Sequence, residues 1–260
     1  YFPCPSALRP RIEFWIDVYG RWTTKDAILH DAQRPHRVYK IIKGKACGIK
    51  SNTQYIKEQK RQIRLQLERI ATMIERKQSI TKAKDRHYLN MFPGRSPSVI
   101  RRAARNLRCQ SGNKDGFRNA LRRFGTYGPI VRRVLKDAGL HQDIQYLPFV
   151  ESSYNPEAYS RVGAAGMWQI MPRTARTLGL ELNATMDERL DPEAASWGAA
   201  RYLKDSRKNL TVAARSKKPN VTDSELTPFV ITSYNYGVNG MRRAIKKLGP
   251  DFLTVLNRYR

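Results

Sequence analysis

A single glutamate, Glu151, stands where a carboxyl group could act as an acid in a reaction. It directly follows the apolar residues 146–150 and precedes a polar stretch at 152–156. At the end of a buried helix, low-polarity surroundings disfavour the charged form of a carboxyl group and raise its pKa. A carboxyl group that holds its proton near neutral pH can serve as a general acid. The residue types alone leave a second interpretation open, in which this glutamate ends a helix and turns to solvent.

A second segment combines small residues with side chains that suit a sugar. The small residues at 163–166 allow a close approach of backbone or ligand, and a methionine, an indole and an amide follow them at once. An aromatic face can stack on a sugar ring, while amides and hydroxyls bond to its hydroxyl groups. The alternative is a turn in the core, in which the two methionines pack. The candidate binding residues are Ser160, Met167, Trp168, Gln169 and Met171.

A third segment is a polar, aromatic turn between two predicted helices, 223–236 and 238–247. It reads S-Y-N-Y-G-V-N-G from Ser233 and adds Tyr234, Asn235 and Tyr236 to the candidates. Taken alone, this segment indicates a helix break and nothing more.

Together the three segments resemble the lytic transglycosylases of glycoside hydrolase family 23, which are related to goose-type lysozyme. The nearest subgroup is the membrane-bound murein transglycosylase D type, which also has Met-Trp-Gln. The resemblance covers about residues 140–250. It rests on three motifs in order: E-S-S-Y-N-P from Glu151, S-x-x-G-A-x-G-M-W-Q-I-M-P-x-T-A from Ser160, and Y-N-x-G from Tyr234.

The resemblance implies a lysozyme-like, mainly helical fold and a role for each matched position. Glu151 matches the single catalytic acid, Tyr234 matches the tyrosine that faces it, and Asn235 supports that turn. The remaining matches are Ser160 and Gln169, which bind the saccharide or its lactyl-peptide, and Met171, which lines the cleft.

The implied reaction is cleavage of the β-1,4 bond between N-acetylmuramic acid and N-acetylglucosamine in peptidoglycan. Glu151 protonates the leaving oxygen, and the muramoyl N-acetyl carbonyl stabilises the developing cation. The carboxylate then takes a proton from the C6 hydroxyl, which gives a 1,6-anhydro sugar, or from water, as in a lysozyme. Both products remain open, and no cofactor or metal is implied.

Two positions depart from the family pattern. Trp168 stands where many members have Met, and Tyr236 stands where most have Ala, with Ser233 replacing a further Ala. Residues 141–200 carry 8 acidic and 4 basic residues, so an acidic cleft would favour the free amines of de-N-acetylated glycan. Tyr236 would narrow the place of an acetyl group. The alternative is that most of these acids lie far from the cleft.

Helical spacing dominates the rest of the chain, so we expect a mainly α fold. It divides into a helical, basic extension at 1–110 and a lysozyme-like catalytic domain at 111–260. Residues 38–42 are the most strand-like stretch. Ser96 or Ser98, Gly139, and Asp187 or Asp191 are the expected helix caps. The other expected helices are 53–89 (one or two), 98–108, 114–124, 128–138, 143–151 and 191–208, with a polar loop at 211–222.

The chain is strongly basic, with 49 Lys and Arg against 22 Asp and Glu and a net charge of +27. Residues 40–108 alone carry 19 basic and 4 acidic residues. Such a surplus is either a solvated helix face or a surface for an anionic wall or membrane polymer. No nucleic-acid-binding motif accompanies it, so no dedicated nucleic acid partner is expected. The alternative function is an inactive cationic protein that binds cell wall or nucleic acid.

The three cysteines, Cys4, Cys47 and Cys109, match no zinc spacing. They form one pair and one free thiol if the protein is exported, or stay unpaired. The substrate lies outside the cytoplasm, so we expect a monomer exported to the periplasm, cell envelope or medium, with its signal removed before Tyr1. No apolar run is long enough to span a membrane.

Overall fold

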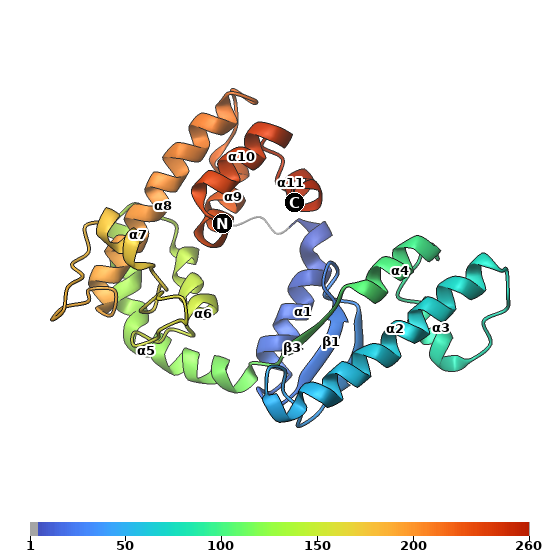
Figure 1. Cartoon of the computed structure of the whole chain (residues 1–260). Helices are drawn as coiled ribbons and strands as arrows, with labels where there is room; N and C mark the ends of the chain where they lie inside the picture. The colour runs from blue at the N-terminus through green and yellow to red at the C-terminus, as the bar shows by residue number, and fades with distance from the viewer. Residues whose placement is uncertain (1–4, 260) are drawn as a thin grey trace. The chain divides into compact units, whose positions relative to one another are not determined.

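The structure, a computed structural model, describes residues 5–259 of the chain (Figure 1). These residues form two compact units, 5–118 and 119–259. The described part holds eleven α-helices and one three-stranded sheet, which confirms the mainly α class. None of the helices described combines the length and apolarity that crossing a membrane requires.

The N-terminal unit is built around an antiparallel sheet with the strand order β2-β1-β3. Its strands are β1 (Ala27–Asp31), β2 (Val38–Ile42) and β3 (Leu107–Ser111). The central strand is buried on both faces, because Leu29 packs into one cluster and Ile28 into another with Phe14. The extension is therefore not wholly helical. The expected strand at 38–42 is present, but the helix expected to run to 108 ends at Arg105, and the chain continues into β3.

Six helical segments complete the N-terminal unit. Helix α2 lies within the expected helical range 53–89, presents Ile63, Leu67 and Ile70 to the core and packs against α4. Ser96 is the N-cap residue of α4 but makes no side-chain capping bond. The segments are η1 (Ser6–Leu8), α1 (Arg9–Gly20), η2 (Lys50–Asn52), α2 (Thr53–Glu75), α3 (Ala83–Leu89) and α4 (Pro97–Arg105).

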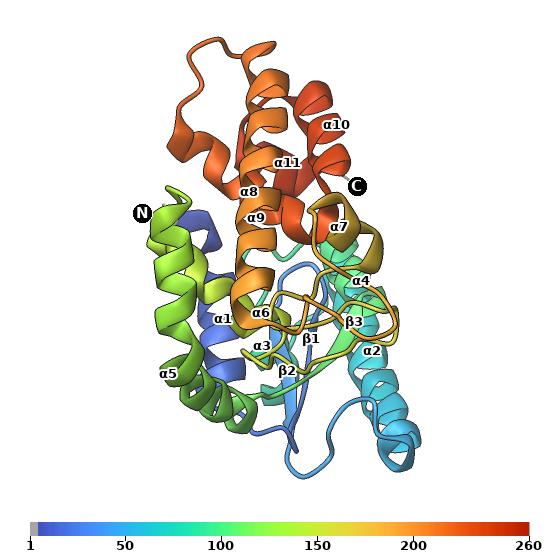
Figure 2. The same cartoon turned by 90° about the vertical axis from the view of Figure 1, so that its left-hand side faces the viewer.

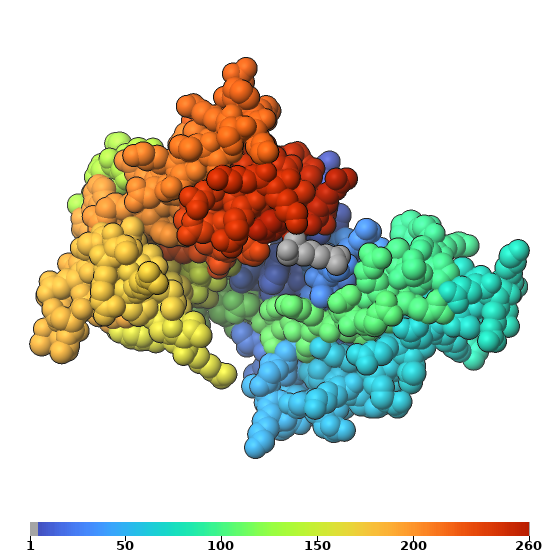
Figure 3. Space-filling model, turned by 45° about the horizontal axis from the view of Figure 1, so that its top comes forward, coloured from blue at the N-terminus to red at the C-terminus, as the bar shows by residue number. Residues whose placement is uncertain are grey.

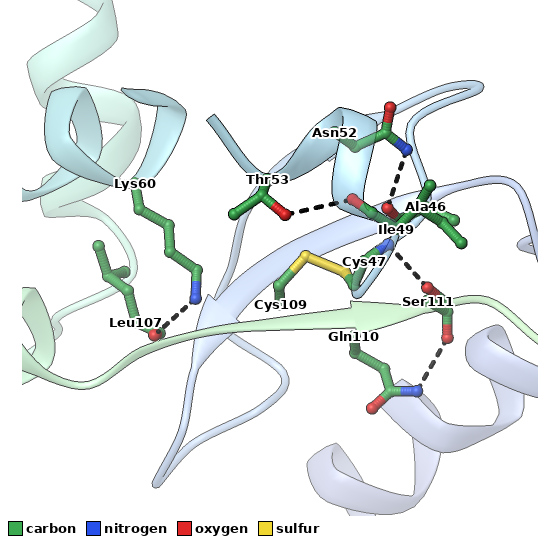
Figure 4. The surroundings of a disulfide bond; sticks show 10 residues. All are labelled: Ala46, Cys47, Ile49, Asn52, Thr53, Lys60, Leu107, Cys109, Gln110 and Ser111. Atoms are coloured by element: carbon green, nitrogen blue, oxygen red, sulfur yellow. Dashed lines mark hydrogen bonds between the residues drawn. A yellow bond between two sulfur atoms is a disulfide. The ribbon is translucent and has the colours of Figure 1, made fainter. Parts of the chain in front are cut away.

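A disulfide bond joins Cys47, in the loop after β2, to Cys109 on β3 (Figure 4). The backbone N–H of Cys47 also donates to Ser111 Oγ at 2.9 Å, so the loop is attached to β3 at two points. Of the two expectations for the cysteines, the paired one is correct for these two residues, while Cys4 lies outside the described residues.

Helix α5 (Lys114–Asp137) begins in the first unit and continues into the second. The sequence predicted two helices here, separated at Gly125. The helix is continuous because a single apolar face, which includes Ala120, Val131 and Leu135, is buried along its length. Pro129 lies within the helix and lacks a backbone N–H, so it removes one donor from the hydrogen-bond ladder.

The C-terminal unit holds the remaining helices, of which α8, α9 and α10 lie side by side (Figure 2). They share a core that includes Leu210, Phe229 and Ile245. Figure 3 shows one face of their outer surface, in orange and red. Helix α9 has the predicted bounds, and Asp191 caps α8 as expected, accepting from two backbone N–H groups. Helix α8 extends to Arg215, into the expected loop. The elements are η3 (Gln142–Tyr146), α6 (Leu147–Glu151), α7 (Pro172–Thr177), α8 (Pro192–Arg215), α9 (Asp223–Tyr236), α10 (Val238–Leu248) and α11 (Phe252–Arg258).

Candidate active site

Glu151 is the last residue of α6, and its side chain is half-buried. The preceding residues Pro148 and Phe149 are buried and anchor this short helix in the unit. Phe149 lies edge-on to the ring of Tyr154, with 4.9 Å between ring centroids. The apolar residues before the glutamate therefore hold it at the end of a helix, as the sequence predicted, without burying it completely.

The chain leaves α6 through a tight turn. Ser153 and Tyr154 have φ angles of +55° and +59°, a left-handed conformation that costs an L-residue about 1–2 kcal/mol. Two hydrogen bonds hold the turn. The Tyr154 hydroxyl donates to the carbonyl of Gln145 at 2.5 Å, and Ser152 Oγ donates to the carbonyl of Met167 at 2.8 Å. The direction of the chain after α6 is thus fixed from two sides.

Two side chains from the end of α9, those of Tyr234 and Asn235, approach Glu151 at the end of α6. Asn235 Nδ2 donates to Glu151 Oε1 at 3.0 Å. Burial raises the pKa of the Glu151 carboxyl group, while the hydrogen bond from Asn235 opposes this by favouring the charged form. The pKa of Tyr234 is also raised, first by burial and then by the nearby charge of Glu151. These surroundings favour a carboxyl group that keeps its proton to a higher pH than an exposed glutamate does.

The hydroxyl of Tyr234 has a definite partner, the backbone carbonyl of Trp168, to which it donates at 2.7 Å. A second tyrosine, Tyr202 on α8, lies edge-on to it with ring centroids 5.4 Å apart and donates its own hydroxyl to the carbonyl of Ser233 at 3.0 Å. Tyr202 was not found from the sequence, because a tyrosine in a helix carries no signal of its own. These contacts fix the Tyr234 ring between α8 and the 160–170 loop.

The polar candidates of that loop bond mainly to its own backbone. Ser160 Oγ accepts from the N–H of Ala164 at 2.9 Å. Gln169, at φ +49°, donates through Nε2 to the carbonyls of Gly166 at 2.9 Å and Ala158 at 3.2 Å. Both side chains therefore shape the loop in this structure.

Arg189, a buried arginine that the sequence did not single out, packs against this loop. Its Nη1 donates to the carbonyls of Gly163 at 2.8 Å and Ile170 at 3.1 Å, and its guanidinium pairs with Asp187 at 2.7 Å. A Cβ atom on Gly166 would lie 1.7 Å from the Arg189 carbonyl oxygen. Here the small residues serve a close approach of two backbone segments, one of the two roles that the sequence indicated.

Two expected binding residues are core residues instead. Trp168 is 0% exposed and donates from Nε1 to Ser196 Oγ at 2.9 Å, and Met167 is 1% exposed. The expectation that a sugar stacks on the Trp168 ring is therefore wrong for this structure, since the buried ring offers no free face. The core interpretation of this turn is correct for Met167.

Met171 and Tyr236 are exposed candidates. Met171 lines a small cavity of about 80 Å³ together with Gln169, Tyr202 and Tyr234. Tyr236 is 53% exposed. Its ring lies edge-on to Tyr259, at 6.1 Å between centroids. The structure therefore brings Met171 to the side of Tyr234, whereas Tyr236 rests against the C-terminal helices.

A larger cavity, of about 390 Å³, adjoins the other side of α6. Tyr146 and Val150 line it from η3 and α6, and Leu203 and Ile231 line it from α8 and α9. Tyr146 and Val150 are large apolar side chains that the structure leaves exposed beside the acidic residue, although the sequence indicated only an apolar run there. Among residues 5–259, no group of three histidines, cysteines or acids is arranged to hold a metal.

Comparison with known families gives this geometry a context. Residues 132–250, which include all three motifs, match the family model described as "Transglycosylase SLT domain". This part of the chain is an SLT domain.

Curated relatives of the SLT domain carry names of the same kind. The chain is 31% identical over 134 residues to membrane-bound lytic murein transglycosylase D of Escherichia coli (strain K12). This match covers 52% of this chain and 27% of that protein. It is 33% identical over 108 residues to membrane-bound lytic murein transglycosylase F of Aeromonas hydrophila, covering 40% of this chain and 19% of that protein. The match thus spans about a quarter or less of the relatives' length. The SLT match leaves the N-terminal unit outside it.

Proposed function

We propose that this protein is a lytic transglycosylase that cleaves peptidoglycan strands between N-acetylmuramic acid and N-acetylglucosamine, with Glu151 as its single catalytic acid. The observation that carries the proposal is the half-buried carboxyl group of Glu151, bonded to Asn235, at the meeting point of the SLT motifs. The names of the curated relatives support the substrate class.

The proposed reaction needs one carboxyl group in two protonation states. Protonated Glu151 gives its proton to the glycosidic oxygen as the bond to the muramic C1 breaks, and the muramoyl N-acetyl oxygen stabilises the cation at C1. The resulting carboxylate is stabilised by the hydrogen bond from Asn235. It then takes the proton of the C6 hydroxyl as that oxygen bonds to C1, which gives the 1,6-anhydro product and restores the acid.

Lysozyme-type hydrolysis is the finer alternative for the second step, with water in place of the C6 hydroxyl. A raised pKa of Glu151 serves both reactions equally. The relatives' names favour transglycosylation, because both are called lytic murein transglycosylases. The mass of the released muropeptides separates the two, since hydrolysis adds one water per cleaved bond, at the muramic acid end of the product.

For substrate binding we propose a path across Met171 and Tyr234, with Ser160 and Gln169 shaping the loop beside it. Support comes from the exposed Met171 side chain at the cavity and from the way both polar side chains bond to the loop backbone. Asn235 is proposed to bind the Glu151 carboxyl group through its hydrogen bond and not the substrate. Tyr236 is proposed to border the path, from its exposed ring at the end of α9.

The decisive experiment is digestion of purified sacculi by the wild type, Glu151→Gln and the matched control Glu157→Gln. Glu157 is exposed and lies in the same segment. We expect 1,6-anhydro muropeptides from the wild type and the control. Activity should fall by about 10²–10⁴-fold in Glu151→Gln, the range for loss of a general acid. An equal rate for Glu151→Gln would refute the role of this residue. Sacculus binding by the wild type with no released muropeptide would favour the inactive cationic wall-binding protein.

A preference for partly de-N-acetylated strands is a further, finer proposal. Its support is the excess of acids in 141–200 and the exposed Tyr236. Several of these acids have local roles instead, since Asp187 pairs with Arg189 and Glu193 with Arg133. Matched acetylated and deacetylated sacculi test it. Faster cleavage of the deacetylated form, reduced in Tyr236→Ala, would support the preference, and equal or faster cleavage of the acetylated form would end it.

For the cellular setting we propose an exported, monomeric protein of the cell envelope whose basic N-terminal unit binds an anionic wall or membrane polymer. Residues 5–118 carry 27 basic and 9 acidic residues. The Cys47–Cys109 bond fits an oxidising compartment outside the cytoplasm. The names of the relatives point to the envelope as well.

A further inference from the structure

One face of α8 contacts both the 160–170 loop and the end of α9. Ser196, Ala199 and Tyr202 follow one another at three-residue steps, so their side chains lie on the same side of the helix. Ser196 accepts the hydrogen bond from the buried indole of the loop, and Ala199 lines the small cavity beside it. Tyr202 reaches the end of α9. This face of α8 therefore holds two separate segments of the candidate site.

The Tyr202 hydroxyl binds the backbone where α9 ends and α10 begins. It donates to the carbonyl of Ser233 at 3.0 Å. Burial raises the pKa of Tyr202, and hydrogen bonds with the Ser206 side chain and the backbone of Val238 oppose this rise. Val238 is the first residue of α10, and the residue before it, Gly237, has a φ angle of +79°. One hydroxyl thus contacts both sides of the turn that joins the two helices.

Tyr202 also contacts the residue that follows Ser233. Its ring lies edge-on to the ring of Tyr234, with 5.4 Å between centroids. Tyr234 itself donates to the carbonyl of Trp168 at 2.7 Å. Ser233 is completely buried, and its own hydroxyl donates to the carbonyl of Val230 at 2.7 Å. The end of α9 is therefore closely held, and Tyr202 contributes to both of these residues.

Asn235 is the next residue along α9 and lies in different surroundings. It is exposed, and its side chain donates to Glu151 Oε1 at 3.0 Å. An exposed side chain has few neighbours to restrict it, so its position depends on the backbone from which it extends. Hydrogen bonds weaken steeply when donor and acceptor lose their alignment. The bond to Glu151 therefore depends on how firmly the end of α9 is held.

We propose that Tyr202 is a positioning residue for the acid. By binding the Ser233 carbonyl, its hydroxyl fixes the end of α9 at the place from which Asn235 reaches the Glu151 carboxylate. Without that hydroxyl, the carbonyl keeps its bond from the N–H of Gly237, at 2.8 Å, but loses its link to α8. The Asn235 side chain then makes its bond in a smaller fraction of molecules. This role rests on the proposed function in one respect, namely that Glu151 is the acid.

The surroundings of Glu151 give the direction of the effect. Within residues 5–259, burial and the hydrogen bond from Asn235 act on the pKa of its carboxyl group, and no charged side chain does. Tyr234 is a titratable neighbour, but burial raises its own pKa well above the usual value, so it stays neutral. Loss of the bond from Asn235 disfavours the carboxylate. Tyr202→Phe should therefore raise the pKa of Glu151, in the same direction as Asn235→Ala.

The test measures the ionisation of Glu151 directly, from its side-chain carboxyl ¹³C resonance in NMR titrations of the full chain. The resonance is assigned by its absence in Glu151→Gln. The variants compared are Tyr202→Phe, Asn235→Ala and the double variant that carries both changes. Ile245→Val is the control, because it removes one methyl group from the buried core shared by α8, α9 and α10, further along α10 from the turn.

We expect the ionisation constant of Glu151 to fall about twofold to tenfold in Tyr202→Phe and at least as far in Asn235→Ala. The double variant should match Asn235→Ala, because two changes that act through one bond do not add. Ile245→Val should leave the constant in place. An unchanged constant in Tyr202→Phe, a further fall in the double variant, or an equal fall in Ile245→Val would overturn the proposal. The titration needs no glycan cleavage, so the role of Tyr202 and the proposed reaction can fail separately.

Discussion

Glu151 can act as an acid only while it holds its proton, and two opposing influences decide when it does. Burial raises the pKa of the carboxyl group, and the hydrogen bond from Asn235 lowers it. Because the protonated form is the active acid, activity should fall as the pH rises through this pKa. The pH at which activity falls on the alkaline side therefore reports how far burial outweighs the hydrogen bond from Asn235.

Removing Asn235 changes that balance in a known direction. In Asn235→Ala the charged form of Glu151 loses its hydrogen-bond donor while burial remains, so its pKa rises further. The alkaline limb of kcat/KM should then move to higher pH. Asn239→Ala, an exposed asparagine on the next helix, is the control and should leave the limb in place. A limb that stays unmoved in Asn235→Ala would show that this hydrogen bond does not tune the acid.

For single residues, the sequence predicted where a side chain lies along a helix or turn, but not whether that side chain is buried or exposed. Glu151 lies at the helix end that the apolar run 146–150 predicted. Trp168 shows where sequence reasoning failed, because an indole beside small residues suits a sugar platform and a core turn equally well. Only the packing around it decides, and here the ring is buried against Ser196.

At the scale of elements, the loop of residues 158–170 depends on one close approach. In Gly166→Ala the new Cβ atom would meet the Arg189 carbonyl oxygen at 1.7 Å, and φ is +78°. Gly179→Ala is the matched control, with φ +73° and no atom within 4 Å. The control should lose about 1 kcal/mol for its backbone conformation alone. Gly166→Ala should lose several times as much.

Denaturant unfolding of both variants measures this difference in the free energy of unfolding. The SLT domain should account for the loss, since both glycines belong to it. Equal losses would mean that the Arg189 segment moves aside without cost.

The disulfide bond ties the loop after β2 to β3 and closes 62 residues of chain. Replacing both Cys47 and Cys109 by alanine should lower the stability of the N-terminal unit by about 4 kcal/mol, the loop-closure value for this length. Unfolding is followed by tryptophan fluorescence and by the helix signal in circular dichroism, so that the transitions of the two units can be separated. Only the transition of the N-terminal unit should shift. Reduction of the wild type should reproduce the effect, and a stability unchanged by both treatments would contradict it.

The predicted elements differed in accuracy for physical reasons. Helix α9 has the bounds that were predicted, and in the structure a capping box at Thr222 and Glu225 and a glycine at 237 mark its ends. Strand β1 was missed because both of its faces are buried, which removes the alternation that identifies a strand. The break expected within α5 does not occur because tertiary burial of one face outweighs Gly125 and Pro129.

For the whole molecule, charge is the property that the sequence predicts most directly. Two thirds of the net charge lie in residues 5–118. Binding of the inactive Glu151→Gln chain to sacculi should therefore weaken steeply with added salt, because attraction between surface charges is screened over about 8 Å at physiological ionic strength. A sedimentation assay over a salt series measures this, with a neutral osmolyte of equal osmolality as the control. Binding that does not depend on salt would exclude the charge-based attachment.

The division into two units was less accessible to sequence reasoning than the charge. The boundary was expected at 110/111, just after the basic region 40–108. The compact units instead divide at 118/119, within the continuous helix α5. A helix that crosses a unit boundary leaves no loop composition to reveal it.

The hydrogen bond from Trp168 Nε1 to Ser196 Oγ has a consequence for how such domains diverge. The Ser196 hydroxyl itself donates to the carbonyl of Pro192 at 2.6 Å, so this buried serine satisfies two groups at once. In a chain with methionine at the position of Trp168, the Ser196 hydroxyl no longer accepts a hydrogen bond from an indole N–H, so alanine becomes tolerable at the position of Ser196. Alanine there beneath a tryptophan would leave a buried indole N–H without an acceptor. The two positions should therefore change together during evolution, with the serine arriving before the tryptophan.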